Sequence, residues 1–246
     1  GVTADAPEYL GLVRTFSPVQ GDEPAIVDWN GDLVFVINHR DFDTNATGNT
    51  ITRVYHKLIM VAEIRGRMAF TSAIVSDGAL YIFGTVGNRE VQMIKSYDLV
   101  SWTAPVTVLR SDARIYNSSV TADPNGFVMA LETDEGVPYT ARFYRSNDLL
   151  SWSLTGQPFH WASYAACPTI RYLNGYYYVF YLVVGDGVYY TRVDRSTDLS
   201  NWETSPYAVL YPQPGEGINT SDMDIAEVNG ITHIIFSVGD QATWGD

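Results

Sequence analysis

The chain has 246 residues, of which 46% are hydrophobic, 13% aromatic and 17% charged. This composition is typical of a protein with a packed core, and it excludes a disordered chain, a collagen and a pure coiled coil. Fifteen basic and 28 acidic residues give a formal net charge of −13. Nucleic acid and anionic membrane surfaces are therefore not expected as partners, because both repel negative charge.

Few features of the sequence constrain its compartment or its cofactors. The single cysteine, Cys167, excludes a disulfide framework and a cysteine-based zinc site within one chain. The longest apolar stretch, residues 176–184, is shorter than the ~20 residues of a membrane-spanning helix. No signal peptide is apparent, although removal of one before Gly1 stays open. We expect a soluble protein, cytoplasmic or secreted, that needs no metal or other cofactor.

Five hairpins recur along the chain, each centred on an Asn-Gly or Asp-Gly pair between two apolar runs. Such pairs tolerate the positive φ angles of a tight turn and are the strongest short hairpin signal in a sequence. Each hairpin predicts the first two strands of a repeated antiparallel unit. In chain order the turns are Asn30-Gly31, Asp77-Gly78, Asn125-Gly126, Asn174-Gly175 and Asn229-Gly230.

A second repeat has the form Ser-x-Asp-Leu-x-x-Trp, and its tryptophans are Trp102, Trp152 and Trp202. It predicts a turn followed by an outer strand, which gives four antiparallel strands in each unit. We interpret the repeated Asp as a turn residue that binds backbone amides, and the repeated Trp as packing between neighbouring units. Neither is expected to belong to a functional site.

The repeats predict an all-β, five-bladed β-propeller with four antiparallel strands per blade. A β-sandwich is the alternative, but a sandwich does not repeat a whole four-stranded unit in register. We expect one domain over residues 1–246, with the fifth blade incomplete at the C-terminus. Residues 9–17 are predicted to supply an outer strand to that blade and close the ring. The predicted blades lie near residues 20–66, 67–113, 114–162, 163–215 and 216–246.

Polar residues that differ between repeats gather at the predicted mouth of the central channel. The catalytic candidates are Glu23 and Asp222, at the start of first strands, and Glu132, at the end of a second strand. Glu132 is the most distinctive of the three because its counterparts in the other repeats are not acidic. The candidate substrate-binding residues come from the same mouth or from the connection after the third repeat, and they are Asp22, His39, Arg40, Asn117, His160, Trp161 and Asp224.

Carboxylates beside His, Arg, Asn and Trp are the residue types that sugar chemistry requires. Glycoside hydrolysis uses one carboxylic acid to protonate the leaving oxygen and a second carboxylate as base or nucleophile. Aromatic faces stack on the sugar, and polar side chains bind its hydroxyls. The alternative interpretation of Glu23 is an exposed acid in a loop. The alternative for Asp222 and Asp224 is that their side chains bind the backbone amides of turns. Residues 41–48 begin like a calcium loop, but the positions of Gly48 and Thr52 argue against an EF-hand.

The five repeats, the Ser-x-Asp-Leu-x-x-Trp turns and the strand YYYVFY after an Asn-Gly turn together resemble the five-bladed propeller glycoside hydrolases, such as families 43 and 32. The resemblance covers about residues 20–244 and implies hydrolysis of arabinosides, xylosides or fructosides by three carboxylates on innermost strands. Those three positions fall on Glu23, Asn117 and Ala166. Only Glu23 retains a carboxylate, so the family's mechanism cannot run here on the family's residues.

Two functions stay open. The first is hydrolysis of a small glycoside or an oligosaccharide chain end, of the furanoside or pentoside type, by Glu132 together with Glu23 or the Asp222 and Asp224 pair. The second is a non-catalytic carbohydrate-binding or scaffold propeller. The expected partner is a carbohydrate, and both a monomer and a dimer fit the sequence.

Overall fold

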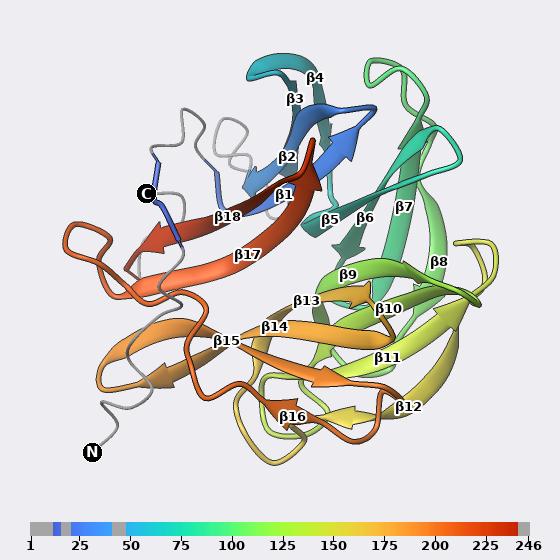
Figure 1. The fold of residues 1–246 in the computed structure, drawn as a ribbon. Helices are drawn as coiled ribbons and strands as arrows, with labels where there is room; N and C mark the ends of the chain where they lie inside the picture. Colours follow the sequence, from blue (N-terminus) through green and yellow to red (C-terminus); the bar gives the residue numbers. More distant parts are fainter. Residues whose placement is uncertain (1–11, 16–20, 41–47, 241–246) are drawn as a thin grey trace.

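The computed structural model describes residues 12–15, 21–40 and 48–240, and the regular structure of this part of the chain consists of β-strands (Figure 1). Within the described residues, no helix is long and apolar enough to cross a membrane. The strands form sheets arranged around a common centre, as predicted for a β-propeller.

Three of the sheets have four antiparallel strands that follow one another in chain order. They correspond to the first three sequence repeats, for which the prediction of four strands per unit is confirmed. Their strands are β1 (Glu23–Trp29), β2 (Asp32–Arg40), β3 (Thr50–His56), β4 (Ile59–Gly66), β5 (Ala69–Ser76), β6 (Ala79–Val86), β7 (Glu90–Ser96), β8 (Val106–Arg110), β9 (Ile115–Asp123), β10 (Gly126–Thr133), β11 (Thr140–Ser146) and β12 (Ser153–Phe159).

The fourth sheet has six strands and corrects the predicted count of five blades. The described part of the last repeat supplies only two strands, and these extend the fourth sheet through one parallel pair, Tyr189 with Asn219, instead of forming a separate sheet. The described strands therefore form four sheets. Those of the fourth are β13 (Ala166–Leu173), β14 (Tyr176–Gly185), β15 (Val188–Ser196), β16 (Glu203–Thr204), β17 (Asn219–Val228) and β18 (Ile231–Gly239).

Both repeated turn motifs have the predicted structural roles. Four of the five hairpin turns have positive φ at both central residues, and in the turn at residues 125–126 only Gly126 does. In the Ser-x-Asp-Leu-x-x-Trp turns the Asp binds backbone amides: Asp148 accepts hydrogen bonds from the N–H groups of Leu150 and Ser151 at 2.9 and 2.8 Å. The Trp packs on the preceding sheet, as Trp152 does edge-on against Phe83 with centroids 6.1 Å apart.

The hydrophobic core lies between neighbouring sheets, in three clusters that join the first sheet to the second, the second to the third and the third to the fourth. The first strands of the five repeats, β1, β5, β9, β13 and β17, are neighbours around the central channel. The ring closes where β17 packs beside β1 (Figure 1). At this closure, the Asp224 carboxylate accepts a hydrogen bond from the Ile26 N–H at 2.9 Å.

The predicted N-terminal strand lies mostly outside the described residues. The described part, residues 12–15, has no strand structure. Its Arg14 forms an ion pair with Glu216 at 2.6 Å, and the guanidinium lies 5.8 Å from the centroid of the Phe236 ring in β18. Residues 12–15 therefore contact the last repeat through the Arg14 side chain. An outer strand over residues 9–17 stays a prediction.

Candidate active site

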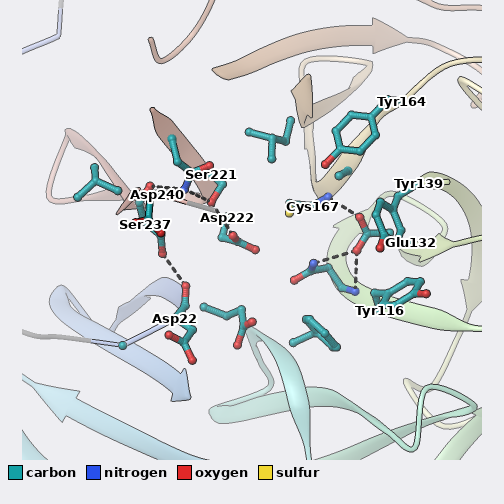
Figure 2. Close-up of a pocket in the computed structure, with 18 residues that line it drawn as sticks. Asp22, Tyr116, Glu132, Tyr139, Tyr164, Cys167, Ser221, Asp222, Ser237 and Asp240 are labelled. Atoms are coloured by element: carbon teal, nitrogen blue, oxygen red, sulfur yellow. Dashed lines mark hydrogen bonds between the residues drawn. The ribbon is translucent and has the colours of Figure 1, made fainter. Parts of the chain in front are cut away.

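A pocket of about 310 Å³ opens at the mouth of the central channel (Figure 2). Its lining comes from the starts of β1, β5, β9, β13 and β17, the ends of β10, β14 and β18, and connections between strands. Among the described residues that line it there is no Lys, Arg or His, whereas five carry a carboxyl group: Asp22, Glu23, Glu132, Asp222 and Asp240. All three sequence-predicted catalytic residues thus lie in one pocket.

Glu132 lies at a bulge near the end of β10. Leu131 pairs with Ser118 and Thr133 pairs with Ile115, so Glu132 faces two residues of β9 instead of one. Its Oε1 accepts hydrogen bonds from Asn117 Nδ2 at 2.9 Å and from the Asn117 backbone N–H at 3.3 Å. Its Oε2 accepts one from the Cys167 N–H at 2.8 Å. The carboxyl group therefore connects the third sheet to the fourth.

The Glu132 carboxyl holds its proton unusually tightly. The residue is only 3% exposed, and this burial raises its pKa to about 7, although the N–H donors of Asn117 and Cys167 favour the ionised form. A carboxylic acid that is still partly protonated at neutral pH can donate a proton to a leaving group.

Asp222 and Cys167 enter the pocket from matching bulges at the starts of β17 and β13. Both have positive φ, 51° and 50°, and in both strands the pairing register shifts at that point. The Asp222 carboxylate accepts hydrogen bonds from Ser221 Oγ at 2.8 Å and from the Cys167 thiol. Burial nevertheless raises the pKa of Asp222, while the two donors lower it.

Glu23 begins β1, and Asp22 precedes it. Both are nearly buried, at 9% and 8% exposure. Burial, followed by the negative charges of Asp222 and Asp22, raises the pKa of Glu23 well above its usual range, and the positive charge of Arg40 opposes this effect. Neighbouring buried carboxyl groups resist ionising together, because each negative charge raises the pKa of the others. The pocket thus favours proton retention by at least part of its carboxyl groups.

Only some of the seven predicted substrate-binding residues lie in the pocket. Asp22 and Asn117 line it, whereas the other five do not. Of these five, Asp224 lies deeper in the channel and pairs with Arg171. His39 and Arg40 are the last residues of β2, and the His39 ring N–H donates to the Arg40 carbonyl at 2.8 Å.

The remaining two candidates, His160 and Trp161, lie in the connection between the third and fourth sheets. His160 Nε2 lies 2.7 Å from the buried Asp194 carboxylate. The Trp161 ring stacks with the Arg142 guanidinium, 4.7 Å from the ring centroid. Neither residue lines the pocket; both bind the connection to the sheets beside it.

Four aromatic residues in the pocket were missed by the sequence reasoning. Phe70, Tyr116, Tyr139 and Tyr164 form a continuous row of edge-to-face contacts with centroid distances of 5.9, 4.9 and 6.0 Å. We call these four residues the aromatic wall. Phe70 and Tyr116 directly precede the strand-start positions compared between repeats, and the other two lie in variable connections. Comparison of the positions just before the strand starts could have found Phe70 and Tyr116.

Among the described residues, no group of three or more His, Cys, Asp or Glu side chains is arranged to hold a metal ion. Most of the calcium-like stretch, residues 41–47, lies outside the described residues.

No protein-family model matches this chain, and no curated protein matches it. Solved structures do match its fold. The chain has a TM-score of 0.64 and 13% identity to Bombyx mori glycoside hydrolase family 32 β-fructofuranosidase, over 89% of this chain and 55% of that one. For a Clostridium thermocellum family 43 α-L-arabinofuranosidase the values are 0.60 and 16%, over 87% and 81% of the two chains.

A third match is the catalytic domain of a Coprinopsis cinerea family 62 α-L-arabinofuranosidase, with a TM-score of 0.67 and 13% identity over 99% of this chain and 93% of that domain. The fold is that of the propeller glycoside hydrolases. At these identities the likeness extends to the fold alone. The chain also spans only about half the length of the silkworm enzyme.

Proposed function

We propose that this protein is a glycoside hydrolase that uses two carboxyl groups of the channel-mouth pocket. The observation that carries the proposal is the buried Glu132 carboxyl, whose pKa is about 7, in one pocket with Asp222 and Glu23. In this proposal Glu132 is the general acid. It gives its proton to the glycosidic oxygen as the bond to the anomeric carbon breaks.

Asp222 is the proposed second carboxylate. Hydrogen bonds from Ser221 and Cys167 favour its ionised form, as a base or nucleophile requires. Glu23 has a pKa raised well above its usual range, so in the same state it keeps a proton and binds a sugar hydroxyl as a hydrogen-bond donor. Glu23 as the second carboxylate is the alternative within this mechanism.

Glu132 lies close to the two positions at which this sequence lacks a family carboxylate. The resemblance puts those carboxylates at Asn117 and Ala166. Glu132 accepts hydrogen bonds from Asn117 and from the N–H of Cys167, which follows Ala166. Its carboxyl group is thus adjacent to both positions, which supports a relocated acid.

The proposed substrate is a small glycoside or an oligosaccharide chain end of the furanoside or pentoside type. The fold likeness to a β-fructofuranosidase and to α-L-arabinofuranosidases supports this class. We further propose that the chain forms one domain and acts as a monomer or dimer.

Substitution of Glu132 by Gln tests the mechanism. Loss of a general acid reduces kcat/KM by roughly 10²- to 10⁴-fold, and by less when the leaving group needs no proton. We therefore expect Glu132→Gln to abolish most activity on phenyl glycosides while 4-nitrophenyl glycosides retain much more of theirs. Hydrolysis of arabinofuranosides, xylosides and fructofuranosides would be followed, with Glu227→Gln, an exposed acid of β17, as control. Equal losses on both leaving groups would refute the acid role.

A carbohydrate-binding propeller without catalysis is the second candidate. The absence of a carboxylate at Asn117 and Ala166 favours it. If no glycoside is cleaved but one raises the melting temperature, this candidate replaces the hydrolase.

A further inference from the structure

The pocket has two chemically different sides (Figure 2). Asp22, Ser221, Asp222, Ser237 and Asp240 lie together on the side formed by β1, β17 and β18. The Tyr members of the aromatic wall lie on the opposite side. Short polar side chains suit the hydroxyls of a sugar ring, whereas aromatic rings suit an apolar surface.

Glu132 lies on the aromatic side. Figure 2 shows its carboxyl group beside Tyr116 and Tyr139, across the pocket from Asp222. A general acid contacts the oxygen that links the sugar to its leaving group, so the leaving group extends toward the acid. The second carboxylate acts at the anomeric carbon, on the sugar's side. If the proposed function is correct, the aromatic wall therefore surrounds the leaving group.

Two members of the aromatic wall are anchored by contacts between connections of the chain itself. These members, Tyr139 and Tyr164, come from two connections that bind each other through backbone hydrogen bonds, Ala165 N–H to the Tyr139 carbonyl at 2.7 Å and Val137 N–H to the Trp161 carbonyl at 3.1 Å. The pair of His160 with Asp194 fixes the second connection to the fourth sheet. A preorganised surface loses little conformational entropy on binding.

We propose that the aromatic wall is the leaving-group subsite and that it takes a planar aromatic aglycone, so that the substrates are phenolic glycosides. This inference rests on the proposed hydrolase function. Beside the aromatic wall, Glu132 and Asn117 bind each other, and the Cys167 thiol donates to Asp222, so these polar side chains already have partners within the described residues. A second sugar, with several hydroxyls to satisfy, suits this side less well than a phenolic ring.

The reaction balances without a co-reactant other than water. The bond between the anomeric carbon and the phenolic oxygen breaks, and its electron pair stays on that oxygen. The oxygen takes the Glu132 proton and leaves as a phenol. Water supplies the hydroxyl group of the released sugar, and its other proton restores the acid.

Binding of sulfur-linked glycosides, which resist hydrolysis, tests the subsite. Phenyl, cyclohexyl and methyl thioglycosides of arabinofuranose, xylopyranose and fructofuranose would be titrated calorimetrically. For at least one sugar, we expect the phenyl compound to bind at least tenfold more tightly than the other two. Tyr139→Ala should remove most of this preference, by weakening phenyl thioglycoside binding more than methyl thioglycoside binding. Tyr97→Ala, at a ring that is 65% exposed on an outer turn, should change nothing.

Tyr139→Leu keeps an apolar side chain in the wall and serves where the Ala variant does not fold. It should lose the preference for phenyl over cyclohexyl. Equal affinity for the three compounds, or no binding of any, would overturn the inference. Hydrolysis of O-glycosides by the wild-type protein tells the two failures apart: if hydrolysis persists, only the aromatic subsite is wrong, and if it is also absent, the proposed function fails too.

Discussion

The Glu132 carboxyl combines two opposing influences within one residue. Three N–H groups point at its oxygens and favour the charged form, whereas its burial favours the protonated form. Burial has the larger effect, because water is excluded and the dielectric is low. The result is an acid that is fixed in orientation by its neighbours and still holds a proton near neutral pH. Both properties are needed for proton donation to a bound substrate.

Stability should depend on pH through this residue. The folded protein keeps Glu132 protonated up to about pH 7, whereas the unfolded chain loses the proton near 4.5. The free energy of unfolding should therefore fall as the pH rises between these values, by about 3 kcal/mol from Glu132 alone. Glu23 and Asp222 have raised pKa values and act in the same direction.

Comparison of the wild-type protein with Glu132→Gln isolates this effect. Urea unfolding at pH 5 to 8 should give a steeper decline for the wild-type protein, with a difference between the two of about 3 kcal/mol over the range. The amide of the variant loses the hydrogen bond to one N–H group, but that cost is the same at every pH. Parallel curves for the two proteins would contradict the raised pKa.

At the scale of single elements, the Ser-x-Asp-Leu-x-x-Trp turn joins local and long-range structure. In its second copy, Leu149 has a φ of 65° and is 2% exposed, while the adjacent Leu150 has 50% exposure. Leu149 packs into the cluster between the second and third sheets, beside Trp152. The motif thus forms a tight turn and also inserts two apolar side chains between sheets.

The adjacent leucines provide a matched comparison. Leu149→Ala should lower the free energy of unfolding by about 2 to 5 kcal/mol, because it leaves a cavity in the core. Leu150→Ala should change it by less than about 0.5 kcal/mol, since the side chain is mostly in water. Guanidinium chloride unfolding at a fixed pH measures both. Similar effects for the two variants would mean that the cluster does not stabilise the fold.

The elements that the sequence predicts well are those with local causes. Asn30-Gly31 and its counterparts form turns because their backbones accept positive φ. No local sequence pattern predicts the bulges at Cys167 and Asp222, since Cys167 is followed by Pro and Asp222 by Met. The conformation of each bulge depends on pairing with the opposite strand. The bulges help to orient pocket residues, so the three carboxyl candidates could be predicted while their hydrogen bonds could not.

For the whole molecule, the pocket depends on the ring being closed, since the side that carries Asp22 and Asp222 comes from β1 and from β17 with β18. The separate sheet predicted for the last repeat did not form, because its described strands are only two and they join β15 by one parallel pair. The periodicity of a sequence gives the number of repeats. It does not show which strands of neighbouring repeats form hydrogen bonds with each other. Tyr139 and Tyr164 were missed for a related reason, since they belong to connections that differ from repeat to repeat.

Substitution of Asp224 tests whether its carboxylate holds the ring closed. Its carboxylate, from β17, binds the Ile26 N–H of β1 and the Arg171 guanidinium of β13, so it joins three strands around the channel. Asp224→Ala would leave a buried N–H without an acceptor and Arg171 without its carboxylate, at a cost of about 3 kcal/mol. Asp224→Asn keeps an acceptor oxygen for Ile26 and should cost less.

The control for ring closure is Glu203→Ala, which removes an exposed ion pair with Arg195 at the outer edge of the fourth sheet and should change stability little. Urea unfolding followed by Trp fluorescence reports stability, and hydrogen exchange of the Ile26 amide reports the closure itself. Because that amide loses the Asp224 acceptor, its exchange should accelerate more in Asp224→Ala than in Asp224→Asn. Unchanged exchange at Ile26 in both variants would mean that β1 and β17 are held together by their apolar contacts, and that the pocket does not depend on this carboxylate.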